Sequence, residues 1–148
     1  MELTFQTARP EDADTIFDLC KALIDRYEDL ESIDYPKVLA WVRRKIDSNI
    51  ESYTCVRCDG AKAGFYRTSI ENSITELDDL YILPEFRNRG IGTFIVKKVC
   101  EESEFPVMLY VFNKNTGACA LYERLGFRVR EYVGSSRKIM VWSPEEWK

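Results

Sequence analysis

The amino-acid sequence predicts one mixed α/β domain over its 148 residues. Three observations point to this class. Residues 2–8 alternate polar and apolar side chains, as half-buried strands do. Segments after Pro10 and Pro36 carry apolar residues at helical spacing, which is typical of amphipathic helices. Residues 106–112 form an almost unbroken apolar run, typical of a strand that is covered on both faces in a parallel arrangement.

The first half is predicted to begin with strand 2–8, followed by a turn at residues 9–12 that leads into a helix ending near Tyr27. Pro10 favours the first turn of a helix, and the acidic residues after it suit the positive end of the helix dipole. An acidic linker separates this helix from a second one at 36–50. Strands 52–58 and 62–70 are joined by Asp59-Gly60, a strong hairpin signal, and a strand at 74–83 continues the meander.

The second half alternates helices and strands. A loop at 84–89 precedes a helix at 90–102, the apolar strand 106–112 and a helix at 115–125 that ends at Gly126, a favourable C-cap residue. Strands 127–133 and 138–142 close the chain as a hairpin. The predicted order is therefore β-α-α-β-β-β-α-β-α-β-β. The sequence shows no repeat and no Pro/Gly-rich linker, which favours a single domain over residues 1–148.

Composition excludes several classes of function. The 21 Lys and Arg residues face 25 Asp and Glu residues, giving a net charge of -4, which argues against a protein that mainly binds nucleic acid. The chain has no histidine, so a Ser-His-Asp triad, a Cys-His dyad and a histidine metal site are all excluded. Proton transfer must use Glu, Asp, Tyr, Cys, Lys, the backbone or water.

Cysteine usage and hydropathy predict a cytosolic protein without a membrane partner. The first residues do not resemble a signal peptide, and no stretch approaches the roughly 20 apolar residues that span a bilayer. Five scattered cysteines suit free thiols in a reducing compartment. Cys55 and Cys58 form a Cys-x-x-Cys that could serve redox chemistry or half a zinc site. However, no second pair exists, and side chains three apart on a strand point to opposite faces, so we expect no metal.

The segment from Arg87 to Thr93 has the features of an anion-binding loop. It lies where a strand leads into a helix, and free N–H groups together with the helix dipole favour anions at that end of a helix. Gly90 and Gly92 remove the Cβ atoms that would hold a phosphate away, and two arginines add cationic donors. The segment matches neither a Walker A loop nor a dinucleotide fingerprint. Taken alone, it fits a polar turn equally well.

Two longer motifs resemble the signatures of the GNAT superfamily of N-acetyltransferases. Residues 80–92, Leu-Tyr-Ile-Leu-Pro-Glu-Phe-Arg-Asn-Arg-Gly-Ile-Gly, resemble a strand and Pro followed by (Arg/Gln)-x-x-Gly-x-(Gly/Ala). In residues 115–127, Asn115 is followed seven positions later by Tyr122 and then by Leu-Gly-Phe, like the family's second signature. The strand leading into Arg-Pro-Glu-Asp at residues 9–12 is also similar to many members. The predicted element order matches the family fold, in which the sheet is splayed between the fourth and fifth strands.

The resemblance implies a binding site for acetyl-CoA, used as acyl donor. The loop would receive the pyrophosphate, the end of the preceding strand would pair its backbone with the pantetheine arm, and Asn115 would reach the cofactor. Asn115 also suits the N-cap of the last helix, and both roles can hold together. The implied cofactor-binding residues are Leu80, Tyr81, Ile82, Arg87, Asn88, Arg89, Gly90, Ile91, Gly92, Thr93 and Asn115.

The resemblance also implies two catalytic residues. Tyr122 matches the tyrosine that protonates the departing CoA thiolate, although the same residue would suit packing on the apolar face of its helix. Glu76 corresponds to the glutamate that some members use as a general base, often through water. An acceptor amine with a pKa of about 10.4 is mostly protonated at pH 7 and needs such a base. Asp78, Asp79 and water are alternatives, and all three carboxylates could belong to a solvated strand face.

The predicted function is transfer of an acetyl group from acetyl-CoA to a primary amine, by direct attack in a ternary complex. The acceptor would be a small cationic metabolite, or a lysine or N-terminal amine of a protein. Acidic residues between the first two helices favour a cationic acceptor, although a solvated acidic loop would look the same. A CoA-binding sensor or partner protein of the same fold, without turnover, is the alternative. A homodimer, the acyl-chain preference and the identity of the amine are left open.

Overall fold

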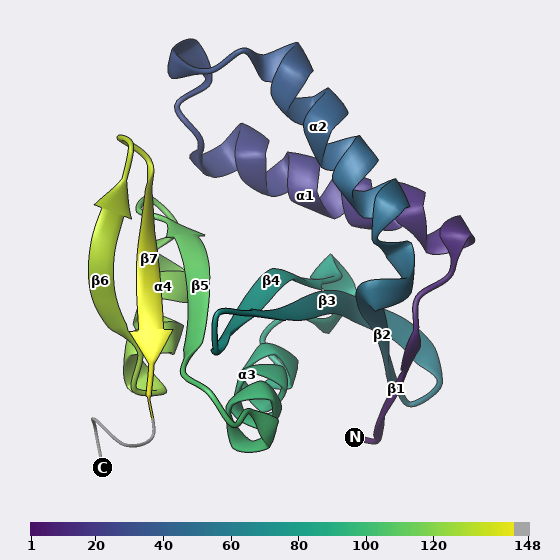
Figure 1. Ribbon diagram of the computed structural model, residues 1–148. Helices are drawn as coiled ribbons and strands as arrows, with labels where there is room; N and C mark the ends of the chain where they lie inside the picture. Colours follow the sequence, from purple (N-terminus) through teal and green to yellow (C-terminus); the bar gives the residue numbers. More distant parts are fainter. Residues whose placement is uncertain (144–148) are drawn as a thin grey trace. The chain divides into compact units, whose positions relative to one another are not determined.

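The computed structural model describes residues 1–143 (Figure 1). The element order is β1 (Leu3–Thr7), α1 (Ala13–Tyr27), α2 (Tyr35–Ser48), β2 (Tyr53–Cys58), β3 (Ala61–Glu71), β4 (Ile74–Ile82), α3 (Ile91–Glu102), β5 (Val107–Phe112), α4 (Thr116–Arg124), β6 (Arg128–Val133) and β7 (Arg137–Trp142). This is the predicted order, with bounds within three residues of those expected at most element ends. Four short 3-10 helices, η1 (Pro10–Asp12), η2 (Leu30–Ser32), η3 (Ile50–Ser52) and η4 (Pro84–Phe86), were not predicted.

The strands form one mixed sheet in the order β1-β2-β3-β4-β5-β7-β6. The pairs β1–β2, β2–β3, β5–β7 and β6–β7 are antiparallel, whereas β4 and β5 are parallel and pair Thr75 with Val107 and Glu76 with Met108. The mixed α/β class is therefore confirmed. Contacts divide the chain into two compact units, one of Met1–Arg67 with Asp79–Ile91 and one of Thr68–Asp78 with Gly92–Lys148. The single domain expected over residues 1–148 stays a prediction.

The first unit contains α1 and α2, which pack side by side (Figure 1). Each helix buries an apolar stripe, with Ile16 of α1 and Ile46 of α2 fully buried, while Tyr53 and Phe65 are buried in the strands. Asp34 begins α2 by accepting a hydrogen bond from the Lys37 N–H, as an N-cap residue does. These helices and strands form the core of this unit.

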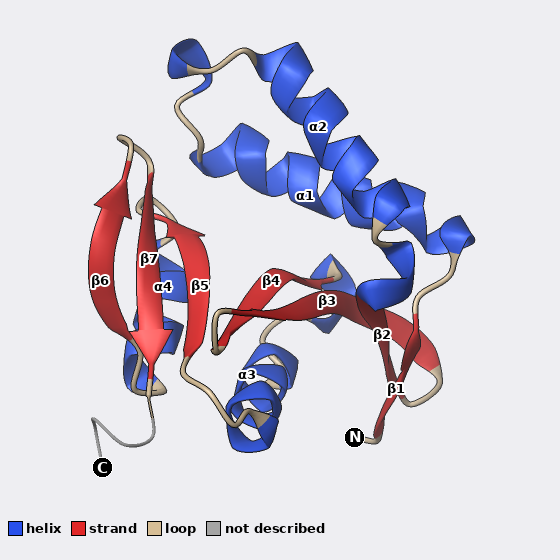
Figure 2. Ribbon diagram, viewed as in Figure 1, coloured by secondary structure: helices blue, strands red, loops and turns tan. Residues whose placement is uncertain are grey.

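The β2–β3 hairpin turns at Asp59-Gly60 as predicted, because both residues adopt positive φ, of 50° and 89° (Figure 2). The register of this hairpin shifts between Val56 and Arg57. Val56 pairs with Gly64 and Arg57 with Lys62, so the extra residue is Ala63 of β3, while β2 keeps a regular register with β1. The alternation along β2 on which the opposite-face prediction for Cys55 and Cys58 rested is therefore not interrupted, and both thiols are buried. The described residues contain no cluster of His, Cys, Asp or Glu that could hold a metal ion.

In the second unit, α4 lies against one face of the strands β5, β7 and β6 (Figure 1). Val107, Leu109, Met140 and Phe127 are buried in its core. The prediction that the strand at 106–112 is covered on both faces was wrong. Val107, Leu109 and Val111 are buried on one face of β5, whereas Tyr110 on the other face is 44% exposed, so this second face is not fully enclosed. The Arg137 guanidinium lies over the Tyr110 ring, 5.1 Å from its centroid.

Candidate active site

The predicted pyrophosphate loop is exposed and follows the short helix η4, which comes after the end of β4. Residues 87–90 are all exposed, and the first N–H groups of α3, which begins at Ile91, have no acceptor within their own helix. Asn88 and Gly90 both have positive φ, of 63° and 81°. Gly90 therefore occupies a conformation that favours glycine, so its presence is explained by the backbone as well as by the proposed ligand.

The two arginines of the loop have structural roles within it. Arg87 donates a hydrogen bond from Nε to the Ile82 carbonyl at 3.1 Å, which holds the loop against the end of β4. The Arg89 guanidinium lies over the Phe86 ring at 5.2 Å from its centroid. Because a guanidinium carries five N–H donors, the Arg87 bond leaves donors available to an anion.

Gly92 lies in the first turn of α3, and a Cβ built on it would meet no atom within 4 Å. Its lack of a side chain is therefore not required by packing within the described residues. An unfilled space at the amino end of a helix agrees with the expectation that a ligand approaches the backbone there.

The end of β4 carries the residues expected to pair with the pantetheine arm. Tyr81 is buried, whereas Leu80 and Ile82 are half-buried. The carbonyl oxygen of Tyr81 lies so close to Gly64 of β3 that a Cβ on Gly64 would overlap it. Sequence reasoning missed Gly64, since a close approach of two strands has no local signature.

The three acidic residues of β4 differ in their surroundings. Asp79 has a positive φ of 51°, and its carboxylate accepts hydrogen bonds from Tyr53, from Lys45 at 3.2 Å and from Tyr81 at 2.8 Å. A carboxylate that already accepts from three donors is poorly placed to take a proton from an amine. Glu76 and Asp78 are half-buried and belong to the second unit, where Glu76 pairs in register with Met108.

Tyr122 lies on α4 in the second unit and is half-buried. Its ring packs against Phe127 with centroids 5.7 Å apart and planes tilted by 55°. Burial, with a smaller effect of Cys119, raises the pKa of Tyr122 to about 12. The phenol therefore stays protonated at all physiological pH values and can act as a hydrogen-bond donor.

Asn115 is the N-cap of α4, as predicted. Its Oδ1 accepts a hydrogen bond from the Ala118 N–H at 3.3 Å. The cap uses the oxygen of the carboxamide, so the amide nitrogen remains a donor that could reach a cofactor. Cys119, which lies in the same motif, is buried, and its thiol donates to the Phe112 carbonyl at 3.7 Å.

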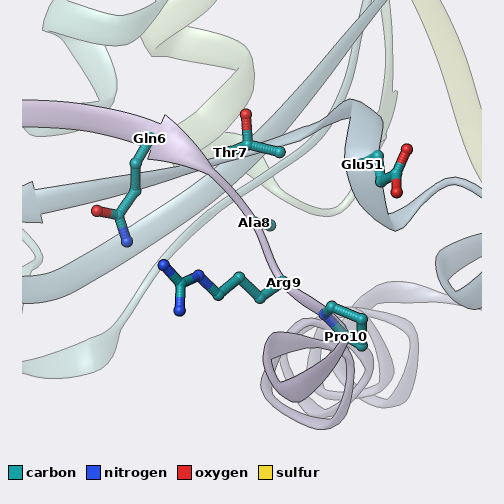
Figure 3. Close-up of a pocket in the computed structure, with 6 residues that line it drawn as sticks. All are labelled: Gln6, Thr7, Ala8, Arg9, Pro10 and Glu51. Atoms are coloured by element: carbon teal, nitrogen blue, oxygen red, sulfur yellow. The ribbon is translucent and has the colours of Figure 1, made fainter.

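A hollow of about 620 Å³ lies in the first unit, away from the predicted site residues. It is shallow and is lined by Gln6–Pro10 and Glu51 (Figure 3). A second one is lined by residues 47–52. Neither hollow is lined by a predicted site residue.

Most of the chain matches the model of a known protein family. The model of the acetyltransferase (GNAT) family matches residues 16–127, which include both signature motifs. The chain belongs to the GNAT family of acetyltransferases. Members of this family use acetyl-CoA as acyl donor. The sheet order and the parallel β4–β5 pair agree with the fold of this GNAT chain's relatives.

Individual relatives resemble the GNAT chain over different lengths. An uncharacterised N-acetyltransferase of Archaeoglobus fulgidus is 23% identical over 86% of this chain and 88% of its own. An uncharacterised N-acetyltransferase of Methanocaldococcus jannaschii is 36% identical over 43% of this chain and 30% of its own length. Mouse thialysine N-epsilon-acetyltransferase is 41% identical over 34% of this chain and 32% of its own. The chain thus matches less than a third of the length of the last two relatives.

Solved structures show the same fold at low identity. The PaiA N-acetyltransferase of Thermoplasma acidophilum, solved with coenzyme A, has a TM-score of 0.72 and 20% identity over 97% of this chain and 99% of its own. The ribosomal-protein-S18-alanine N-acetyltransferase of Escherichia coli has a TM-score of 0.67 and 20% identity. The match covers 95% of this chain and 93% of that enzyme's chain. Among the described residues, no helix combines the length and apolar character needed to cross a membrane.

Proposed function

We propose that this GNAT protein transfers an acetyl group from acetyl-CoA to a primary amine by direct attack in a ternary complex. The observation that carries the proposal is the exposed loop at 87–90, which leads into the unfilled amino end of α3 inside the segment that matches the family. Backbone N–H groups there, with Arg87 and Arg89, would bind the pyrophosphate. The backbone of Leu80–Ile82 would pair with the pantetheine arm, and Asn115 would donate to the cofactor.

The proposed reaction uses residues of the second unit for proton transfer. The amine lone pair attacks the thioester carbonyl carbon, the carbon–sulfur bond breaks, and the thiolate takes the hydroxyl proton of Tyr122. Glu76, directly or through water, accepts the proton that the amine loses. Asp78 remains an alternative base, whereas the three donors around Asp79 argue against it.

The acceptor is proposed to be a lysine-like primary amine. The mammalian relatives that match about a third of the chain act, by their name, on the ε-amine of thialysine. The acidic linker between α1 and α2 supports a cationic acceptor. The structure reduces the number of linker carboxylates that could attract it. Asp25 is bound to Lys21 and Tyr35, and Asp34 caps α2, which leaves Glu28, Asp29 and Glu31 as the linker carboxylates to test. We also propose that the protein acts in the cytosol, consistent with its free cysteines, without binding nucleic acid or membrane.

The central experiment measures coenzyme A binding by calorimetry and thiol release with a panel of amines. Gly92→Leu should abolish binding with little loss of stability, because nothing packs within 4 Å of the new Cβ. Lys97→Leu, which adds a similar side chain to the exposed part of α3, is the control. Micromolar affinity in Gly92→Leu would contradict the loop assignment. Coenzyme A binding without turnover of any amine would favour the sensor alternative.

A test of the linker uses Asp29→Asn and Glu31→Gln, both on exposed residues. The KM for a cationic amine should rise while the KM for acetyl-CoA stays constant, because the carboxylates attract only the acceptor. An unchanged amine KM would remove the linker from the acceptor site.

A further inference from the structure

A buried ion-pair network is centred on Asp79, the one residue of β4 with a positive φ. Non-glycine residues rarely adopt this conformation, and aspartate is among those that tolerate it. The kink falls immediately before Leu80–Ile82, the segment proposed to pair with the acyl donor. The groups around Asp79 therefore act on the backbone at the point where that segment of β4 begins.

The side chain of Asp79 is nearly fully enclosed by donors. It is 10% exposed, and that of Lys45, 3.2 Å away, is 20% exposed. The hydroxyl of Tyr53 donates to Oδ2, and the hydroxyl of Tyr81 donates to Oδ1 at 2.8 Å. A buried carboxylate needs a cation and well-aligned donors to replace water, and this arrangement supplies both. The carboxylate can therefore adopt few other positions.

These donors come from elements that are distant in sequence but belong to the same unit. Lys45 is on α2, Tyr53 begins β2, and the Tyr81 hydroxyl also hydrogen-bonds the Cys20 thiol of α1. We call Lys45, Tyr53, Asp79 and Tyr81 the Asp79 clamp. On the β3 side, the missing side chain of Gly64 allows the Tyr81 carbonyl to approach closely. The backbone of residues 79–82 is thus held by its side chains and by the strand beside it.

We propose that Asp79 is a positioning residue, whose clamp fixes the backbone N–H and C=O groups of Leu80–Ile82 for pairing with the acyl donor. This inference rests on the proposed function of that segment. A preorganised strand edge binds an extended ligand more tightly, because the segment loses less conformational freedom on binding. The carboxylate acts through Tyr53, Lys45 and the strand, and it does not touch the reacting atoms.

Two measurements test the clamp. Tyr53→Phe removes one donor and keeps the packing of a buried ring, while Tyr132→Phe removes an exposed hydroxyl elsewhere and serves as its control. We expect Tyr53→Phe to raise the Kd for coenzyme A about three- to tenfold, the range that one hydrogen bond provides. Amide hydrogen exchange at residues 80–82 should become faster by a similar factor, and the melting temperature should fall by a few degrees, because a buried carboxylate loses one donor. Tyr132→Phe should change neither quantity.

A second pair of variants separates the carboxylate from the backbone conformation. Asp79→Gly permits positive φ without any carboxylate, and Asp79→Asn keeps the shape but loses the charge. Both should weaken coenzyme A binding at least as much as Tyr53→Phe does. Wild-type affinity in Asp79→Gly, or faster exchange without weaker binding in Tyr53→Phe, would overturn the proposal. If the unmodified protein binds no coenzyme A, the proposed function fails, while the exchange rates still report whether the clamp holds the strand.

Discussion

The carbonyl oxygen of Tyr81 occupies the space that a Cβ on Gly64 would need. Gly64 lies in β3 and Tyr81 lies in β4, so the glycine is required by its neighbour and not by its own backbone angles. This close approach packs β3 against Leu80–Ile82 of β4, the segment that is proposed to pair with acetyl-CoA.

Gly64→Ala should lower the free energy of unfolding by roughly 1–3 kcal/mol, since overpacked sites force backbone shifts. Because the atom it meets is backbone, no side-chain rotation can relieve the overlap. Denaturant unfolding measures this, with Gly117→Ala as the control, because a Cβ at Gly117 meets no atom within 4 Å. Equal stabilities of the two variants would show that β4 can move away freely.

Tyr122→Phe should reduce kcat by roughly 100-fold or more with little change in the Kd for coenzyme A, as expected for loss of a general acid. Steady-state kinetics and calorimetry together measure the two quantities. Normal turnover in this variant would remove Tyr122 from the reaction and leave its packing against Phe127 as its role.

The same tyrosine makes a prediction about alkaline pH. Its pKa is about 12 in the folded protein and about 10 in an unfolded chain, so the unfolded state loses its proton first. Its contribution to stability is therefore complete below pH 10 and declines as the pH rises toward 12. Tyr122→Phe should show a smaller loss of stability over that range, measured by denaturant unfolding at each pH. Any decline in activity below about pH 10 must come from another group.

Glu76→Gln should lower kcat at neutral pH and shift the rate profile toward higher pH, where the amine loses its proton without help. The pH dependence of kcat/KM measures this. Asp78→Asn is the informative comparison, because Asp78 is the remaining carboxylate candidate on β4. If the shift appears in Asp78→Asn and is absent from Glu76→Gln, the base is Asp78.

Asn115→Ser separates the two roles of Asn115. Serine keeps an oxygen that caps α4, so the melting temperature should stay close to that of the unmodified protein. It removes the amide nitrogen, so the Kd for coenzyme A should rise about two- to tenfold if that group donates to the cofactor. Asn115→Ala should lose about 1 kcal/mol of stability in addition. An unchanged Kd in Asn115→Ser would leave Asn115 as a cap alone.

The sequence predicted most elements because their signals are local. Asp59-Gly60 marks a hairpin through its own backbone preference, and the apolar stripes of α1 and α2 reflect the helical period. The exposure of Tyr110 was not predictable in this way, because an apolar run does not state how many faces of its strand are covered. The extra residue of β3, Ala63, was missed for a similar reason, since it shows only in the register with β2.

By itself, the sequence determined the element order, the exclusion of histidine chemistry and the motifs that lie within the family match. Only the tertiary structure showed the three donors that surround Asp79, one of the three candidate carboxylates of β4. Two of these donors, Lys45 in α2 and Tyr53 in β2, lie 34 and 26 residues away in the chain. Contacts over such separations depend on how helices and strands pack, which no short window of residues encodes.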